Sequence, residues 1–353
     1  MNTDISPNHE LSPPSQQSAH FAWDLAALLA APVRWVAGWL FLSAFIRRFI
    51  NAPEKMNPDA AGYVGEKFNH FMPNAVAGQK EMIEWLLANP SQLHIFLIVF
   101  SVLEGLCGLG LLTGTLTRLS ALGISLMSYG VLTGAGWLGS TCLDEWQIGS
   151  LGMTGALVIM GTGAGPISID RLVLSRIKKP WLPWLTSGPL FDTPRIPLRF
   201  SIGFISATTV AIFIMLATYQ AFFNGLWGKL HNHSVRPEIE LSQVKIDPTT
   251  GATSFRIYRS GGPDTYGAFI VSARLKDANG TVLSEAGPQQ LADINPNSIT
   301  NEYLVKVHPR ANALLVPLGG AATVEMELPP HTGTPAVLEL EDVSGITFQG
   351  EIQ

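Results

Sequence analysis

Five stretches of nearly unbroken apolar residues run along the first two thirds of the chain. The second stretch, Leu93–Gly114, has the length that an α-helix needs to cross a bilayer core of about 30 Å. Its one formal charge is on Glu104. The pattern predicts five membrane-spanning helices. Their predicted ranges are Pro32–Ile50, Leu93–Gly114, Leu119–Leu138, Trp146–Ile169 and Phe204–Phe223.

After about Pro237 the pattern changes to short runs in which apolar and polar residues alternate, as they do in half-buried strands. The DANG stretch at Asp277–Gly280 separates two of these runs and indicates a hairpin turn. We predict an antiparallel β-sandwich of about seven strands over residues 237–353. The runs are IELSQVKI, SFRIYR, FIVSARLK, YLVKV, TVEMELP and AVLELEDV.

Glycines four residues apart occur in three of the predicted helices, and small residues at this spacing let membrane helices approach closely. The fifth predicted helix has no glycine between Phe204 and Phe223. The predicted fold class is therefore an all-α membrane four-helix bundle, a fifth tethering transmembrane helix, and an all-β, sandwich-like extracytoplasmic domain. The glycine pairs are Gly110/Gly114, Gly130/Gly134 and Gly161/Gly165.

The polar, Pro- and Ser-rich start of the chain has no basic, apolar signal peptide, and we expect a disordered tail there. The segment KKPWLPWLTSGPLFDTPRIP has the composition of a linker. The predicted organisation is a disordered cytoplasmic tail at 1–24, the bundle at 25–175, a cytoplasmic Pro-rich linker at 176–198, the fifth transmembrane helix at 199–226 and the β domain at 237–353.

The composition supports a membrane protein, because 47% of the residues are hydrophobic and only 14% are charged. The net charge of −5 and the absence of a basic run argue against nucleic acid as a partner. Two cysteines, Cys107 and Cys142, cannot form a disulfide framework or a four-thiolate metal site. No motif for haem, flavin or metal is seen, and His231 and His233 are interpreted as solvated residues beside the membrane.

Short loops indicate the orientation, because cytoplasmic loops of membrane proteins carry an excess of Lys and Arg. The connection between the fourth and fifth predicted helices is basic, whereas the turn GSTCLDE before the fourth helix has two acids and no basic residue. We therefore expect a multi-pass protein of a bacterial or archaeal plasma (inner) membrane, with a cytoplasmic N-terminus and a periplasmic or otherwise extracytoplasmic β domain. The basic residues of that connection are Arg171, Arg176, Lys178, Lys179, Arg195 and Arg199.

Glu104 lies about halfway along the second predicted helix, where a carboxylate costs about 2.5–3.5 kcal/mol by insertion scales. One interpretation is a structural carboxyl that is protonated or hydrogen-bonded within the bundle. The other is a group that handles protons or orients a ligand, which is the usual reason for an acid inside a membrane. We take Glu104 as a candidate catalytic residue.

Arg47 and Arg48 end the first predicted helix, still within the far part of the bilayer core. They either extend to the head groups, or at least one faces the bundle and binds an anion or pairs with Glu104. Guanidinium groups suit oxyanions such as sulfur oxoanions. Arg34 starts the same helix and is expected to extend to the membrane surface.

The turn GSTCLDEWQ supplies four further candidates: Cys142 and Glu145 as catalytic residues, Asp144 and Trp146 as substrate-binding residues. Cys142 lies in a short loop rather than an apolar core, but the neighbouring acids would raise its pKa and disfavour a thiolate. Its role is left open between lining the site and bonding sulfur. Cys107 is too deep in the second helix to reach Cys142 and is interpreted as a packing residue.

Three motifs in this region resemble a known family: FLSAFIRRFINAPEK, LEGLCGLGLLTGTLTRLSAL and GWLGSTCLDEWQIG. Over about residues 30–175 the chain is similar to the DoxD subunit of thiosulfate:quinone oxidoreductase, within the wider DoxX-like membrane family. The fifth helix and the β region are similar in layout to the DoxA subunit fused behind it. The resemblance implies oxidation of thiosulfate, or a similar sulfur oxoanion, to tetrathionate, with membrane quinone as electron acceptor.

Three other functions compete with this interpretation. A non-catalytic DoxX-like scaffold for another redox enzyme would explain the missing cofactor motif. A thiol–quinone enzyme of the vitamin K epoxide reductase type requires paired redox cysteines, which this chain lacks. Transport of a sulfur oxoanion is disfavoured because no internal repeat or interrupted helix is evident. Assembly as a homo-oligomer and the quinone used are left open.

Overall fold

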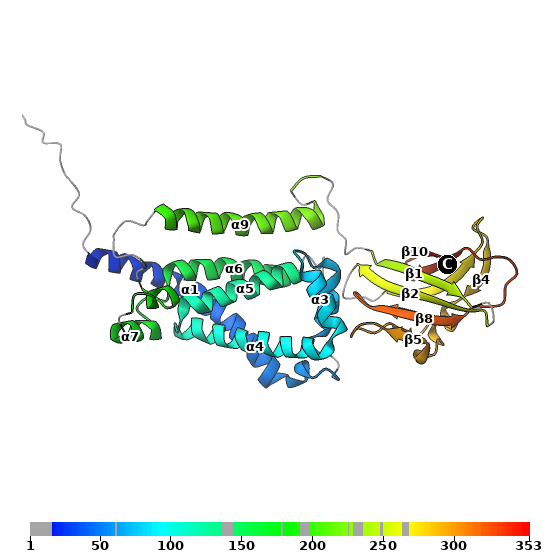
Figure 1. Cartoon of the computed structure of the whole chain (residues 1–353), viewed down its shortest axis with the longest axis horizontal. Helices are drawn as coiled ribbons and strands as arrows, with labels where there is room; N and C mark the ends of the chain where they lie inside the picture. The colour runs from blue at the N-terminus through cyan, green and yellow to red at the C-terminus, as the bar shows by residue number, and fades with distance from the viewer. Residues whose placement is uncertain are drawn as a thin grey trace, which may run out of the picture. The chain divides into compact units, whose positions relative to one another are not determined.

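The computed structural model of the chain describes residues 16–60, 62–135, 144–177, 179–188, 190, 198–224, 226–228, 236–247, 250–262 and 268–353. Helices come first along the chain and strands follow (Figure 1). Contacts divide the chain into two compact units. The first unit comprises Met1–Ile46, Val102–Met127 and Leu151–Phe213, and the second comprises Arg47–Ser101, Ser128–Ser150 and Ile214–Gln353.

Long helices occupy all five predicted apolar stretches. They are α1 (Gln16–Ile46), α4 (Pro90–Thr113), α5 (Thr117–Ala135), α6 (Asp144–Thr162) and α9 (Leu198–Phe223). In the described residues, three segments are long and apolar enough to cross a membrane: His20–Asn51, Pro90–Thr113 and Leu198–Ala221. The helical, membrane-type character of this region is confirmed, whereas five spans arranged as a four-helix bundle with a tether remain a prediction.

The ends of two helices differ from the prediction. Helix α1 begins at Gln16, so residues 16–24 of the expected disordered tail are helical, and Pro32 lies inside the helix rather than in its first turn. Apolar side chains at Leu25, Leu28 and Leu29 continue the helix N-terminally, and membrane helices tolerate an internal proline. Helix α6 ends at Thr162, because the chain turns at Gly163, where φ is +72°.

Close approaches involve three of the six predicted glycines, Gly110, Gly114 and Gly165, where an added Cβ would lie within 3.0 Å of another residue, and also glycines that were not predicted. A Cβ on Gly108 of α4 would lie 2.5 Å from the backbone nitrogen of Leu42, and one on Gly38 of α1 would lie 2.9 Å from the carbonyl of Gly108. These two glycines let the backbones of α1 and α4 approach. Gly130 has no atom within 4 Å of such a position, so the prediction of close packing there is wrong.

Helix α9 contrasts with the other long helices. None of its apolar window is buried within the protein, whereas 39% of the corresponding window in α4 is buried. A helix that is apolar all round and has little buried surface is suited to lipid contact. Its role as a tether stays a prediction.

Short helices follow α1 in the second unit: η1 (Arg47–Asn51), η2 (Pro53–Met56), α2 (Glu66–Phe71), η3 (Met72–Asn74) and α3 (Gln79–Ala88). Aromatic rings connect this segment to α4, since the ring centroids of Phe68 and Phe96 lie 5.9 Å apart in an edge-on arrangement. Buried apolar side chains of the segment and of α4 form one cluster with residues of the β domain. Its buried helical members are Met56, Tyr63, Met72, Ile83, Leu86, Leu87, Leu93 and Leu97.

The C-terminal domain contains two antiparallel sheets, which confirms the predicted all-β class. One sheet has the strand order β1-β2-β8-β5 (Figure 1). The other has the order β10-β9-β3-β7-β6, and β4 pairs with β3. The strands are β1 (Glu238–Ile246), β2 (Ala252–Gly261), β3 (Ala268–Lys276), β4 (Val282–Ala286), β5 (Ile299–Asn301), β6 (His308–Arg310), β7 (Ala313–Val316), β8 (Ala321–Glu327), β9 (Val337–Asp342) and β10 (Thr347–Glu351).

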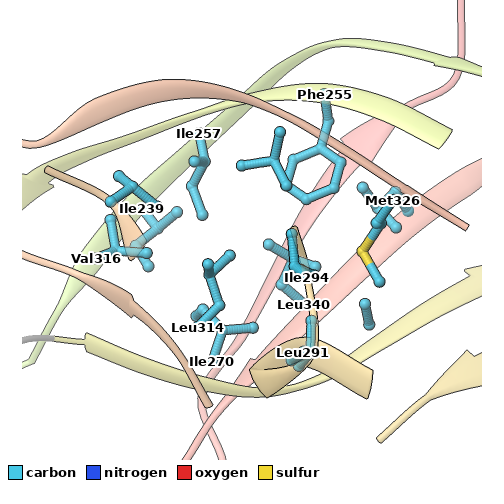
Figure 2. Packing of buried hydrophobic residues seen from close by; sticks show 14 of the residues in the cluster. Ile239, Phe255, Ile257, Ile270, Leu291, Ile294, Leu314, Val316, Met326 and Leu340 are labelled. Atoms are coloured by element: carbon cyan, nitrogen blue, oxygen red, sulfur yellow. The ribbon is translucent and has the colours of Figure 1, made fainter. Parts of the chain in front are cut away.

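The core of this domain is built from alternating side chains of both sheets. Phe255 and Ile257 from β2 point toward Ile270 and Leu314 from the other sheet, and all four are fully buried (Figure 2). Leu291 of the short helix α10 (Pro288–Ala292) joins the same cluster. Burial of each such side chain contributes about 1.5–3 kcal/mol. The alternating apolar positions in the sequence therefore identify the faces of the two sheets that pack against each other.

The predicted hairpin at DANG is confirmed between β3 and β4. Backbone N–H groups of Thr281 and Asn279 donate to Oδ1 of Asp277 at 2.8 and 2.9 Å, and Gly280 has φ of +84°. These hydrogen bonds hold the pKa of Asp277 below its usual value, with the bond from Thr281 as the largest cause. A carboxylate at the first position and glycine at the last thus set the turn.

The run YLVKV was predicted as a strand, and this prediction is wrong. Strand β5 ends at Asn301 and β6 begins at His308, so Tyr303–Val307 is a loop. Two of its backbone N–H groups bond to side chains instead of a neighbouring strand. Val305 donates to Oδ1 of Asn69 at 3.3 Å and Val307 donates to Oδ1 of Asn301 at 2.6 Å. Alternation of apolar residues here serves packing rather than sheet pairing.

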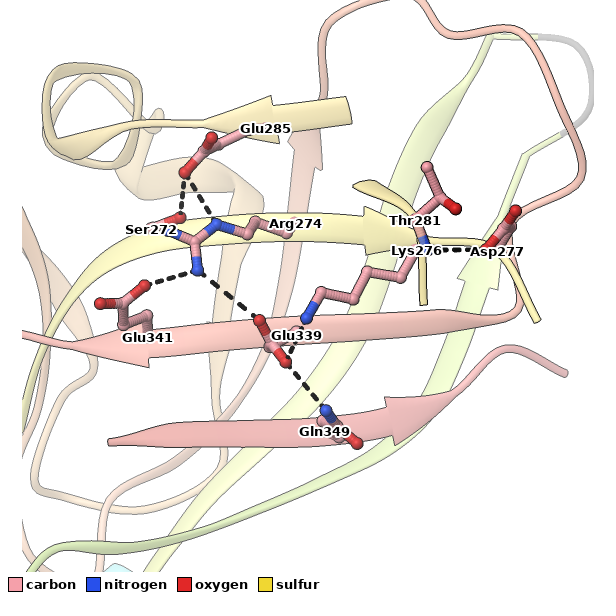
Figure 3. Close-up of polar contacts among 9 residues, drawn as sticks. All are labelled: Ser272, Arg274, Lys276, Asp277, Thr281, Glu285, Glu339, Glu341 and Gln349. Carbon is pink, nitrogen blue, oxygen red and sulfur yellow. Dashed lines mark hydrogen bonds and ion pairs between the residues drawn. The ribbon is translucent and has the colours of Figure 1, made fainter. Parts of the chain in front are cut away.

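A ladder of charged side chains crosses the polar face of the six-stranded sheet (Figure 3). Arg274 of β3 contacts Glu285 of β4 at 2.8 Å and also pairs with Glu341 of β9. Hydrogen bonds from Ser272 and Arg274 hold the pKa of Glu285 below its usual value. Because opposite charges alternate across neighbouring strands, the ladder supports the strand register.

Candidate functional site

Glu104 lies on the buried face of α4. The residues at 101, 104, 105, 108 and 111 are buried, while those at 102, 103, 106 and 109 are exposed, which is the pattern of a helix with one protein-facing side. The Glu104 side chain is only 6% exposed. One turn further along, Gly108 packs against α1. The carboxyl group is therefore directed into the protein and away from the exposed face.

Arg47 and Arg48 belong to η1, a π-helical turn that follows α1. Wider turns of this kind occur frequently at functional sites. Arg47 is exposed and Arg48 is half-buried. Nη1 of Arg48 donates to Oγ of Ser101 at 3.1 Å, and Ser101 is 1% exposed. Of the two arginines predicted to bind an anion, Arg48 is thus fixed to α4, one helical turn before Glu104.

Tyr63 and His94 form a pair that the sequence did not single out. The Tyr63 hydroxyl lies 3.5 Å from Nδ1 of His94, and Tyr63 is 3% exposed. Burial raises the pKa of Tyr63. His94 precedes Ser101 by seven residues, which is nearly two helical turns, so both lie on one side of α4. The one sequence feature that could have indicated this pair is the histidine inside an otherwise apolar run.

The candidates around Cys142 lie wholly or partly outside the described residues. Cys142 lies outside the described residues. Asp144, Glu145 and Trp146 begin α6, and their side chains lie outside the described part of the chain. Cys107 is a free cysteine, and a Cβ on Gly123 of α5 would lie 2.6 Å from its Sγ. This contact agrees with a packing role for Cys107.

A second polar cluster surrounds Asp170, in the first turn of α7 (Ile169–Arg176). Its side chain is 1% exposed and accepts hydrogen bonds from the backbone of Leu116 (2.7 Å) and Thr117 (2.9 Å). The hydroxyls of Thr117 (2.6 Å) and Ser187 (3.1 Å) also donate to it. Four donors around one carboxylate compensate for its burial. Sequence reasoning missed Asp170, although it is an acid within a markedly basic connection.

Two buried arginines lie in the same unit and correct a prediction. Arg34 does not extend to the membrane surface: it is 1% exposed, and it donates to the carbonyls of Leu111 (2.7 Å) and Ile167 (3.1 Å). Leu111 lies in the last turn of α4, where carbonyls lack partners within the helix, and Ile167 lies two residues before α7. The fork geometry of guanidinium suits two separate acceptors.

Arg118 is likewise buried, at 5% exposed, and donates to three backbone carbonyls. Its acceptors are Met160 (2.9 Å), Gly188 (2.9 Å) and Pro183. Pro183 belongs to the short helix α8 (Leu182–Leu185). Part of the segment with linker composition is therefore held against the helices by Arg118, and Arg118 is not an exposed loop charge.

Groups of three or more His, Cys, Asp or Glu side chains suited to a metal ion are not found in the described residues. The first unit holds the buried carboxyl of Glu104, and the second unit holds Arg48 bonded to Ser101 and the Tyr63–His94 pair. Such groups can bind an anion and transfer protons.

Comparison with known proteins identifies both parts of the chain. Residues 29–198 match the family described as TQO small subunit DoxD, and residues 222–351 match the family described as TQO small subunit DoxA. No solved structure matches the chain. The DoxD match contains α4, α5, α6, Glu104, Arg34 and Arg118, and the DoxA match contains all ten strands of the described β domain. The protein therefore belongs to the DoxD and DoxA families of thiosulfate:quinone oxidoreductase small subunits, joined here in one chain.

Proposed function

We propose that this protein is a membrane-bound thiosulfate:quinone oxidoreductase. Two thiosulfate ions lose one electron each and join through a new S–S bond to give tetrathionate. The two electrons, with two protons, reduce one membrane quinone to quinol. The single observation that supports this best is the buried Glu104 carboxyl within an apolar helix of the DoxD region, because an acid inside a membrane helix commonly serves proton transfer.

The residues divide between the two half-reactions in this proposal. Arg48, with Arg47 near it in η1, attracts and holds the dianion through charge-assisted hydrogen bonds. Glu104 delivers a proton to the reduced quinone. Cys142, Asp144, Glu145 and Trp146 line the substrate side, and Cys142 either packs there or bonds the outer sulfur transiently.

The decisive measurement is thiosulfate-dependent reduction of a decyl-quinone by the purified full chain in detergent. We expect quinol formation that requires both substrates, with tetrathionate produced in a one-to-one ratio to quinol. A well-folded preparation that is inert with both substrates would contradict the proposal and favour a non-catalytic scaffold.

The proposed orientation places the N-terminus in the cytoplasm and the β domain on the periplasmic or other extracytoplasmic side of the plasma membrane. Arg171, Arg176, Lys179 and Arg199 support it, because their exposed side chains give the segment between α6 and α9 an excess of positive charge. A reporter active only outside the cytoplasm, fused after Gln353, is expected to be active. Activity of a cytoplasmic reporter at the same position would reverse the assignment.

A further inference from the structure

The DoxD and DoxA regions are joined by a polar contact centred on Asn69. This asparagine lies in α2, within the DoxD match, and is fully buried. Its Nδ2 donates to the carbonyl of Gly319 at 3.2 Å, and its Oδ1 accepts from the backbone N–H of Val305 at 3.3 Å. Both partners lie in the DoxA match. One side chain therefore satisfies two backbone groups of the β domain.

The backbone of the β domain approaches α2 closely at Gly319. This glycine lies in the turn between β7 and β8, has φ of +71°, and its N–H donates to the carbonyl of Arg259 at 3.0 Å. A Cβ at Gly319 would lie 1.8 Å from the carbonyl oxygen of Asn69. Since that atom belongs to the backbone, a side chain at Gly319 would force the two parts to separate.

Apolar side chains extend the contact around this polar centre. Tyr258 of β2 and Ala321 of β8 belong to the same buried cluster as Tyr63, Met72 and the buried leucines of α3 and α4. Tyr303 and Leu304, from the loop that replaces the predicted strand, pack against this cluster. The Tyr303 hydroxyl also donates to Oε1 of Glu84 at the margin, at 3.3 Å. An apolar centre with polar groups at its edge is the usual composition of a protein–protein interface.

We propose that this contact is a subunit interface retained within one chain, and that it holds the β domain on the DoxD region without help from the covalent link. The two regions match two separate small-subunit families, which can function as separate chains only if a non-covalent surface joins them. The link passes through α9, whose apolar window has no buried residues. The docking face comprises Tyr258, Tyr303–Val305, Gly319 and Ala321. The proposal does not depend on the reaction that the protein catalyses.

The test uses the full chain with a specific protease site inserted between Gly228 and Arg236. After complete cleavage in detergent, the helical part is captured through an N-terminal tag and the retained fraction of the β fragment is measured. We expect the wild-type fragment to be retained through repeated washing. Release of a folded wild-type fragment at once after cleavage would overturn the proposal.

The first variant changes the β-domain side of the contact. Gly319→Ala is expected to lower the retained fraction by at least about tenfold, because its Cβ overlaps the Asn69 backbone. Gly345→Ala is the matched control: φ is +82° there, and nothing lies within 4 Å of the added atom. The Gly345→Ala variant has a similar backbone strain but its added Cβ touches no other residue. It should retain the β fragment as the wild type does.

Asn69→Ala tests the same contact without changing the β domain. We expect about a tenfold loss of retention, because two buried backbone groups lose their partner. Asn89→Ala is its control, since the side chain of Asn89 bonds to Trp85 of its own helix at 2.8 Å. Retention at the wild-type level in both Gly319→Ala and Asn69→Ala would show that the contact does not hold the domain.

Discussion

Replacing Glu104 by Gln is expected to lower the turnover of thiosulfate-dependent quinone reduction by about 100-fold or more, since a positioned acid–base group commonly contributes 10²–10⁴-fold. Gln keeps the size and shape of the side chain and a hydrogen-bonding oxygen, but it cannot exchange a proton at neutral pH. The KM for thiosulfate should change little, because in this proposal the anion is held by Arg48. Steady-state kinetics across pH 5–8 with the purified variant provides the measurement.

Two comparisons make the Glu104 result interpretable. Glu81→Gln makes the same chemical change at an exposed position on α3 and should leave turnover unchanged. Arg48→Gln should raise the KM for thiosulfate with a smaller effect on turnover, because it removes a charge-assisted contact and leaves proton transfer in place. Full turnover of Glu104→Gln throughout the pH range would mean that the carboxyl is structural.

Replacing Asp170 by Ala is expected to destabilise the helical part by about 3–5 kcal/mol, the range for breaking a buried charge network by removing one partner. The change leaves the backbone N–H groups of Leu116 and Thr117 without their acceptor. It also removes the charge that acts electrostatically on Arg34 and Arg118, both of which stay buried. Thermal unfolding in detergent should show a fall in Tm of about 10 °C.

The same substitution at Asp24 provides the control for Asp170. Asp24 pairs with Arg171 at 3.2 Å, but its side chain is 30% exposed and that of Arg171 is 48% exposed. An exposed ion pair contributes about 0–1 kcal/mol, so Asp24→Ala should change Tm by no more than about 3 °C. Equal Tm values for the two variants would contradict a structural role for the cluster around Asp170.

Local patterns were sufficient to locate most elements of this protein. Long apolar runs predicted α4 and α9 to within a few residues at most ends, and alternation predicted most strands of the β domain. The DANG turn was predicted because Asp277 and Gly280 satisfy its geometry within a few residues of chain. Glu104 was identified because placing a carboxyl in an apolar membrane helix costs free energy, whatever the helix packs against. The motifs around it also indicated the family.

Contacts between distant residues could not be found in this way. Arg34 was expected at the membrane surface, yet it is buried because carbonyls 77 and 133 residues away accept its hydrogen bonds. Tyr303–Val307 has the alternation of a strand, but the side chain of Asn69 takes the backbone N–H of Val305. Such partners are chosen by the folded arrangement and leave no periodic signal in the chain.

The sequence by itself determined where most of the long helices and strands form, which family the two halves resemble and that one carboxyl lies deep in an apolar helix. Each of these depends on spacing over at most a few helical turns or strand residues, which the order of side chains specifies directly. Only the tertiary structure decided that Asp170 accepts hydrogen bonds from four donors and that Arg48 donates to Ser101. The same holds for the hydrogen bond from Asn69 to Gly319, which lies 250 residues away in the chain. Those contacts form because an unpaired buried polar group costs free energy, and the partners that pair these groups are far away in the chain.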